Sequence, residues 1–209
     1  MEHNAEILPF ARQHILGVCG IHAARFPHSR STMLGMRFLR KMYEWFLEHP
    51  VAFGVVAVRQ EAVRGFAVGT TGGYSRAIFR YALPQIVLGI ASRPWLLLTQ
   101  KDRMFNLWRS HIRGLLPRYG VSRNAYPQEK QKKPSAALAS IAVSESEQGR
   151  GIGRSLLEAF EGMARERGCY SMSLSVEADN SQARKAYEKA GWVVTSETPS
   201  KVHYKKQIR

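Results

Sequence analysis

Cysteine is scarce in this sequence, which holds only Cys19 and Cys169 among its 209 residues. Two cysteines cannot build the disulfide framework of a small secreted domain. Neither cysteine, nor any of the seven histidines, lies at a spacing typical of metal ligands. We therefore expect two reduced thiols packed in the core, and we predict no metal site.

Acidic residues are also few, with 16 Asp and Glu against 31 Lys and Arg, so the net charge is +15 at pH 7. Such an excess favours an anionic partner, which is a nucleic acid, an acidic membrane surface or a phosphorylated ligand. The basic stretches lack the regular aromatic interleaving of single-strand binding surfaces, and no helix-turn-helix or zinc pattern is present. Nucleic acid is therefore the least favoured of the three.

Long apolar runs are missing. The longest candidate, 81–92, contains Pro84 and is far shorter than the roughly 20 residues that span a bilayer. The N-terminus does not show the basic and then apolar layout of a signal peptide. We expect a cytoplasmic protein, with a peripheral position at the inner membrane face as an alternative.

The first third of the chain predicts two helices and a hairpin. Helical periodicity indicates helices over 11–25 and 33–47, separated by a break at Phe26-Pro27. Two β-rich runs, 51–58 and 63–69, are joined by a short polar link and favour a β-hairpin.

Residues 72–135 differ from the rest in composition. They hold twelve basic and two acidic residues, a net charge of +10, or about two-thirds of the whole excess. Two or three short helices are expected here, broken at Pro84, Pro94 and Pro117, with an exposed loop over 126–135. We interpret this stretch as a basic helical insertion within a single domain of residues 1–209.

A regular α/β pattern follows the insertion. Strands are predicted over 137–143 and 170–176, and a helix over 181–191 is closed by Gly191. The chain then predicts two more strands, "WVVTS" and "VHYKK". The C-terminal run "KVHYKKQIR" (201–209) is expected to be a charged edge strand.

The segment "QGRGIGRSLLEAFEGMARERG" (148–168) combines a glycine-rich turn with an amphipathic helix. Amide groups at a helix N-terminus lack partners inside the helix, and the helix dipole attracts anions there. Glycines let a pyrophosphate approach the backbone, and Arg150 and Arg154 can add charge-assisted hydrogen bonds. Neither a P-loop nor a dinucleotide fingerprint fits the spacing. The segment therefore predicts a pyrophosphate site.

Two motifs of this half resemble the GNAT family of N-acetyltransferases. The family's Gln/Arg-x-x-Gly-x-Gly/Ala motif, which follows a strand, is matched by Gln148, Gly151 and Gly153. Its later motif is matched by Asn180, Ala183, Ala186, Tyr187, Gly191 and Trp192. The resemblance covers about 137–196 and extends to 1–69, but not to 72–135. It implies an α/β fold with a mixed, largely antiparallel twisted sheet flanked by helices.

The same resemblance implies acetyl-CoA as co-substrate. The family spreads the strands equivalent to 139–143 and 170–176 apart, and the pantetheine arm lies between them. Amides over 148–154 would hold the pyrophosphate, and the main chain of Val143 would bind the pantetheine. The implied cofactor-binding residues are Ile141, Ala142, Val143, Gln148, Gly149, Arg150, Gly151, Ile152, Gly153, Arg154, Asn180, Ala183 and Tyr187.

Acetyl transfer needs a base for the amine and an acid for the leaving thiolate. Tyr187 is the predicted acid, and Glu177 is the candidate base. Family members that acetylate ribosomal-protein N-termini carry a Glu twelve residues before the Tyr; here that residue is Ser175, which counts against that subfamily. Deprotonation assisted by substrate or relayed by water stays open, as do purely structural roles for Tyr187 in the core and Asn180 as a helix cap.

The predicted reaction is N-acetylation of a small, anionic amine acceptor, such as a nucleotide- or lipid-linked amino sugar. Alternatives are a protein lysine or N-terminal acetyltransferase, and a non-catalytic module that binds acyl-CoA or nucleic acid. Three roles for 72–135 stay open: lining an acceptor pocket, resting on an anionic membrane surface, or forming a homodimer interface or lid.

Overall fold

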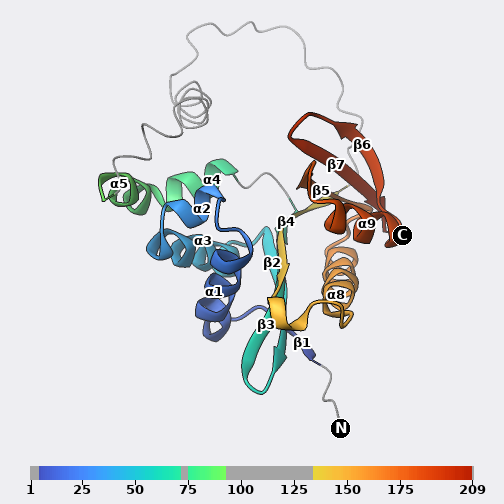
Figure 1. Ribbon diagram of the computed structural model, residues 1–209, viewed down its shortest axis with the longest axis horizontal. Coiled ribbons are helices and arrows are strands. Elements are labelled where there is room, and N and C mark those ends of the chain that lie inside the picture. Colours follow the sequence, from blue (N-terminus) through green and yellow to red (C-terminus); the bar gives the residue numbers. More distant parts are fainter. Residues whose placement is uncertain (1–4, 72–74, 93–133, 209) are drawn as a thin grey trace, which may run out of the picture.

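The computed structural model describes residues 5–71, 75–92 and 134–208. Within these residues, seven strands form one twisted sheet in the order β1-β2-β3-β4-β5-β7-β6 (Figure 1). Neighbouring strands are antiparallel except β4 and β5, which are parallel. The strands are β1 (Glu6–Pro9), β2 (Ala52–Arg59), β3 (Ala62–Thr70), β4 (Ser135–Val143), β5 (Ser171–Glu177), β6 (Val193–Glu197) and β7 (Lys201–Gln207). This is the mixed, largely antiparallel sheet that the sequence predicted.

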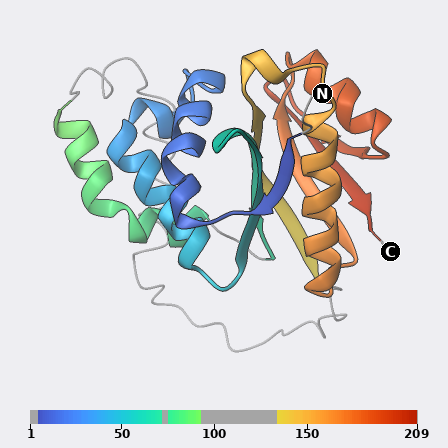
Figure 2. The same cartoon turned by 90° about the horizontal axis from the view of Figure 1, so that it is seen from below.

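Helices cover both faces of the sheet, as Figure 2 shows. One face carries η1 (Arg12–His14), α1 (Ile15–Arg25), α2 (Arg30–Met33), α3 (Met36–Glu48), α4 (Ser75–Tyr81) and α5 (Leu83–Ala91). The other carries α8 (Ile152–Glu166) and α9 (Ser181–Lys189), while η2 (Glu145–Glu147) precedes α8. Each face has its own apolar core, one centred on Tyr43 and Phe66 and the other on Phe160 and Leu156.

The β2–β3 hairpin confirms the prediction, and its turn has an unusual composition. Gln60 and Glu61 both have left-handed backbones, with φ of 52° and 60°. Glycine and asparagine favour this turn geometry, because glycine has no Cβ and asparagine tolerates the left-handed region better than most other residues. On its other edge, β2 pairs with β1, a short strand that the sequence analysis missed.

The predicted helix over 33–47 is divided. α2 ends at Met33 and α3 begins at Met36, because Gly35 between them has a φ of 95° that no helix accommodates. The predicted helix over 11–25 corresponds to η1 followed by α1.

Cys19 and Cys169 are free thiols, one in each apolar core, as expected.

The prediction of a charged edge strand at the C-terminus is wrong. β7 lies between β5 and β6, so β6 forms the edge. Val202 and Tyr204 of β7 are buried, whereas Lys201 and Lys205 are exposed. The lysines therefore lie on the open face of an inner strand. Alternation of apolar and charged residues occurs in inner strands and in edge strands, so it does not distinguish the two.

Only part of the predicted insertion is described. α4 and α5 lie within it, and the chain turns between them at Ala82, just before Pro84. Pro94, Pro117 and the loop over 126–133 lie outside the described residues. β4 begins at Ser135, two residues before the predicted strand.

No helix of the described residues is long and apolar enough to cross a membrane.

Candidate active site

The parallel pair at the centre of the sheet is short. β4 and β5 are in register only over 135–137 and 171–173, although β4 continues to Val143 and β5 to Glu177. β3 keeps pairing with β4 as far as Val143, after an irregularity between Val68 and Gly69. The later part of β4, which includes Ile141, Ala142 and Val143, is therefore paired on one side and diverges from β5 on the other (Figure 1).

The glycine-rich turn follows β4 after the short helix η2. Gly149 and Gly151 have φ of 76° and 80°, and Gly151 is the N-cap of α8. A Cβ at either glycine would meet no atom of the described residues within 4 Å. The glycines are thus required by the backbone conformation, and they leave the main chain open on its outer side. An anion as large as a pyrophosphate fits such an exposed helix N-terminus.

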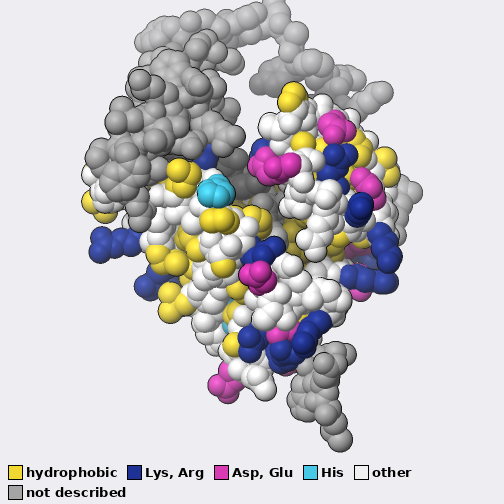
Figure 3. Space-filling model, in the orientation of Figure 1, with side chains coloured by type: hydrophobic (Ala, Val, Ile, Leu, Met, Phe, Trp, Pro, Cys, Tyr) yellow, Lys and Arg dark blue, Asp and Glu magenta, His cyan; other side chains and the backbone are white. Residues whose placement is uncertain are grey.

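Basic side chains surround this turn. Arg150 is half-exposed, and Arg154 is exposed and donates to Glu158 over 2.8 Å. Figure 3 shows dark blue side chains gathered over the loop between β4 and α8. The structure thus places Gln148, Gly149, Arg150, Gly151, Ile152, Gly153 and Arg154 in one continuous segment beside the diverging strands.

Asn180 begins α9. Its side-chain oxygen accepts a hydrogen bond from the Ala183 amide at 3.1 Å, so it is the helix N-cap. This capping role was one of the two predicted for Asn180. Capping engages only the side-chain oxygen, and the amide nitrogen of an asparagine is a separate donor. Contact of Asn180 with a cofactor stays a prediction.

Tyr187 lies on the inner side of α9, where only 8% of it is exposed. Its ring packs against Trp192 at a centroid distance of 6.0 Å and against Tyr204 at 5.9 Å. Burial raises the pKa of Tyr187 to about 12, because the phenolate is poorly solvated there. At neutral pH its hydroxyl therefore carries a proton.

Glu177 lies on the other side of β5 from Tyr187. Leu174 and Val176 pack in the same core as Tyr187, so Ser175 and Glu177 project from the opposite face. Glu177 is 63% exposed, with Lys201 Nζ at 3.7 Å. Ser175 Oγ and His203 Nδ1 are 2.9 Å apart across the β5–β7 pair. The structure thus confirms the shared strand face but does not bring Glu177 and Tyr187 together on one face of β5.

Glu147 was not identified from the sequence. It is 1% exposed, although it ends the short polar helix η2, and its carboxylate forms an ion pair with Arg59. No sequence pattern distinguishes it from its exposed neighbour Glu145. Among the described residues, no group of three His, Cys, Asp or Glu side chains is placed to hold a metal ion.

The fold and these motifs agree with known acetyltransferases. The sequence profile of the Acetyltransferase (GNAT) family matches residues 21–192. An N-acetyltransferase from Staphylococcus aureus Mu50 has a TM-score of 0.61 at 12% identity, with coverage of 99% of this chain and 100% of that chain.

Two further solved structures show the same fold. The PaiA N-acetyltransferase from Thermoplasma acidophilum, in complex with coenzyme A, has a TM-score of 0.59 at 13% identity, covering 98% of this chain and 99% of that one. The ribosomal-protein-S18-alanine N-acetyltransferase from Escherichia coli has a TM-score of 0.56 at 15% identity, covering 97% and 93%. No curated protein matches the sequence.

The family profile spans most of the chain and includes the strand, the glycine turn and the α9 motif described above. The chain belongs to the GNAT family and is an acetyltransferase that uses acetyl-CoA.

Proposed function

We propose that this enzyme transfers the acetyl group of acetyl-CoA to a primary amine on a small, anionic acceptor. The observation that carries the proposal is the continuity of the diverging β4 edge with the open glycine turn. In the reaction the amine nitrogen bonds to the thioester carbonyl carbon, and the carbon–sulfur bond breaks. The products are an amide and coenzyme A, after one proton leaves the nitrogen and one reaches the sulfur.

The geometry supports a donor site along β4 and the glycine turn. Amides over 148–154 would hold the pyrophosphate at the start of α8, assisted by Arg150 and Arg154. The main chain of Ile141, Ala142 and Val143 would bind the pantetheine along the edge that β5 leaves. Asn180 and Ala183 would contact the donor from the first turn of α9.

Tyr187 is the proposed general acid. A phenol with a pKa of about 12 stays protonated at neutral pH and can protonate the leaving thiolate. Its position on α9, above the part of β5 that diverges from β4, supports this role.

Glu177 is the proposed base, acting from the other face of β5 through a water molecule. Glu177→Gln should lower kcat/KM for the acceptor by about a hundredfold. Glu197→Gln, which removes an exposed carboxylate from β6, is the matched control. An unchanged rate in Glu177→Gln would assign the proton transfer to the substrate or to another group.

The anionic acceptor is supported by charge. The chain carries a net charge of +15, and 72–135 carries +10 of it. A positive field raises the local concentration of anionic substrates. Amines linked to a nucleotide and amines linked to a lipid phosphate both carry negative phosphate charge. Nucleotide-linked and lipid-linked amino sugars are therefore the first acceptors to test.

The first experiment is calorimetric titration of acetyl-CoA into the protein and three variants. Gly151→Glu places a carboxylate on the proposed pyrophosphate site and should weaken binding at least about tenfold. Gly151→Ala reports backbone strain alone, because φ is 80° and the space is open. Gly162→Glu adds the same charge inside α8, where φ is ordinary and space is also open, and should bind normally.

The outcomes separate the alternatives. Binding by the wild type followed by turnover of small anionic amines supports the proposal. Turnover of peptide lysines or N-termini alone would favour the protein acetyltransferase. Binding without turnover of any amine would favour a module that only binds acyl-CoA, and no binding of acetyl-CoA by the folded wild type would overturn the proposed site.

A further inference from the structure

Glu147 is buried in a segment that is otherwise exposed. Glu145, Ser146, Gln148 and Gly149 all face solvent, whereas Glu147 is 1% exposed. Burying a carboxylate is costly unless ion pairs and hydrogen bonds compensate for the lost hydration. Its position one residue before the glycine turn therefore calls for an explanation in terms of what it contacts.

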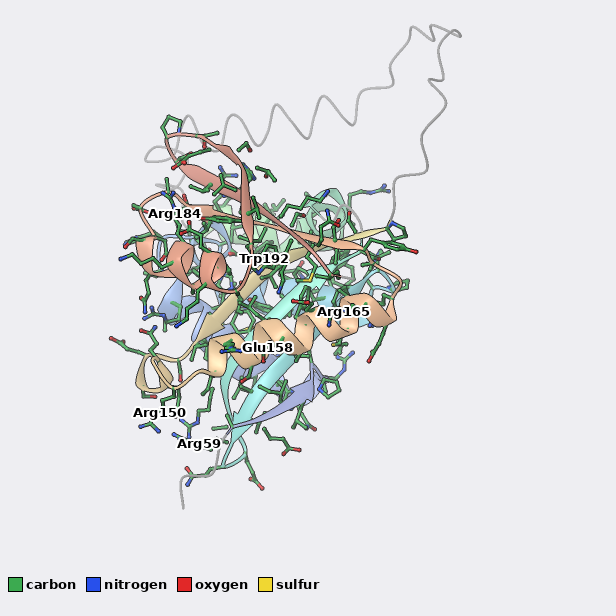
Figure 4. All side chains as sticks on the ribbon, turned by 90° about the vertical axis from the view of Figure 1, so that its right-hand side faces the viewer. Arg59, Arg150, Glu158, Arg165, Arg184 and Trp192 are labelled. Atoms are coloured by element: carbon green, nitrogen blue, oxygen red, sulfur yellow. The ribbon has the colours of Figure 1, made fainter. Side chains whose placement is uncertain are left out.

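Two arginines from different parts of the chain flank its carboxylate. The Arg59 guanidinium donates a hydrogen bond to Oε1, and Arg150 Nη1 lies 3.9 Å from Oε2. Oε2 is buried, and no hydrogen bond to it is found within the described residues. Glu147 thus lies between an arginine of the β2–β3 hairpin and an arginine of the glycine turn. Figure 4 labels these two arginines, Arg59 and Arg150.

The hairpin holds the loop at a second point. The Ser144 amide donates to the Arg64 carbonyl over 2.8 Å, where β3 leaves the hairpin turn. The segment after β4 is therefore attached to the β2–β3 pair by one backbone hydrogen bond and one partly buried ion pair. At Gly149 and Gly151, a Cβ would meet no atom of the described residues within 4 Å. Side-chain packing therefore does not fix the backbone of these two glycines.

We propose that Glu147 is a positioning residue for the pyrophosphate of the acetyl donor, acting through Arg59 and Arg150. Its ion pair with Arg59 fixes the start of the turn, so that the following amides have a set direction. Its attraction for Arg150 keeps that guanidinium over the turn. This inference rests on the proposed function, because it assumes that the turn binds the pyrophosphate.

The sign of the effect distinguishes positioning from plain electrostatics. A carboxylate beside an anion site repels the anion, so neutralising Glu147 should tighten binding if only charge matters. If Glu147 positions the turn, neutralising it should weaken binding despite the lost repulsion. Preorganised donors lose much of their effect when they must be ordered upon binding.

The test is calorimetry with coenzyme A on Glu147→Gln, beside Glu145→Gln as the control. Glu145 lies in the same short helix, carries the same charge and is exposed. Glu147→Gln should raise the Kd at least about tenfold, roughly the effect of one lost charge-assisted hydrogen bond. Glu145→Gln should leave the Kd unchanged or lower it slightly.

Amide hydrogen exchange supplies a readout that a general loss of stability does not imitate. In Glu147→Gln, exchange should increase over 148–155 and stay unchanged in β2, β3 and α8 beyond its first turn. Increased exchange throughout the sheet would mean that the ion pair only stabilises the fold, and would overturn the positioning role.

Arg59→Lys carries the test if Glu147→Gln does not fold. It keeps the charge pair but loses the planar guanidinium geometry, and it should weaken binding of coenzyme A in the same direction. Unchanged or tighter binding in a folded variant would overturn the inference while leaving the proposed function intact. Failure of the wild type to bind coenzyme A would overturn both.

Discussion

At the scale of single residues, burial decides what several titratable side chains can do. Tyr187 and His22 are both buried, and burial shifts the pKa of each so that its neutral form persists. For Tyr187 this means a phenol that keeps its proton. For His22, on α1, burial lowers the pKa to about 4, so the imidazole is neutral under most conditions.

Tyr187→Phe removes the hydroxyl and leaves the ring in its packing site. We expect kcat to fall about a hundredfold or more, while the Kd for acetyl-CoA stays within about twofold, because the hydroxyl is the proposed proton donor to the leaving thiolate. The wild-type kcat should not decline up to pH 10 through ionisation of Tyr187, since its pKa is about 12. A decline with an apparent pKa near 10 that Tyr187→Phe abolishes would contradict this assignment.

His22 should make the fold less stable in mild acid. Its Nδ1 lies 2.6 Å from the Tyr43 hydroxyl in the α1–α3 core. In the unfolded chain the imidazole takes up a proton below its ordinary pKa, whereas in the folded chain it does so only near pH 4. Stability is therefore lost as the pH falls from about 6.5 to 4, by up to about 3 kcal/mol. His14, whose pKa burial also lowers, adds to the loss in the same direction.

Urea unfolding at pH 7.5 and pH 5.0 measures this effect. The free energy of unfolding should differ much less between the two pH values in His22→Gln, which keeps a polar group but does not titrate. His28→Gln is the control, because His28 is exposed in the loop between α1 and α2. Equal pH dependence in the wild type and His22→Gln would show that His22 does not titrate as its burial requires.

At the scale of elements, the sequence predicted those whose signals are local. The glycine turn, α9 and the β2–β3 hairpin were recognised because glycines, caps and alternation lie within a few residues of each other. β1 was missed because four residues carry too little pattern, and its partner strand lies over 40 residues away. The inner position of β7 and the burial of Glu147 depend on long-range pairing, which no local pattern encodes.

The β2–β3 turn offers a stability prediction of its own. Gln60 and Glu61 both adopt left-handed conformations, which cost free energy for residues with a Cβ. The double substitution Gln60→Asn and Glu61→Gly installs the residue types that this turn favours, and it should raise the free energy of unfolding by about 1 kcal/mol. Thermal unfolding measures the change, and a lower midpoint would show that the native side chains contribute contacts that outweigh the strain.

At the scale of the whole molecule, the sheet has two halves, β1–β4 and β5–β7. They are joined only by the short pairing of β4 with β5, beyond which these two strands diverge. The half with β1–β4 carries α1 to α5 on one face, and the half with β5–β7 carries α9 on the other (Figures 1 and 2). The proposed donor site therefore combines distant positions: Gly151 in the turn after β4, Tyr187 on α9, and Arg59 through its ion pair with Glu147. The family motifs identified Gly151 and Tyr187, and only the three-dimensional arrangement identified Arg59.

The net charge of +15 predicts how the acceptor reaches this gap. Attraction between a basic protein and an anionic substrate raises the association rate, and salt screens that attraction over a Debye length of about 8 Å at physiological ionic strength. We therefore expect kcat/KM for a phosphorylated amine to fall about tenfold between roughly 20 and 300 mM salt. The same amine without its phosphate is the matched control, and its kcat/KM should change little. Equal salt dependence for both amines would assign the effect to acetyl-CoA binding, and it would remove the support that charge gives to an anionic acceptor.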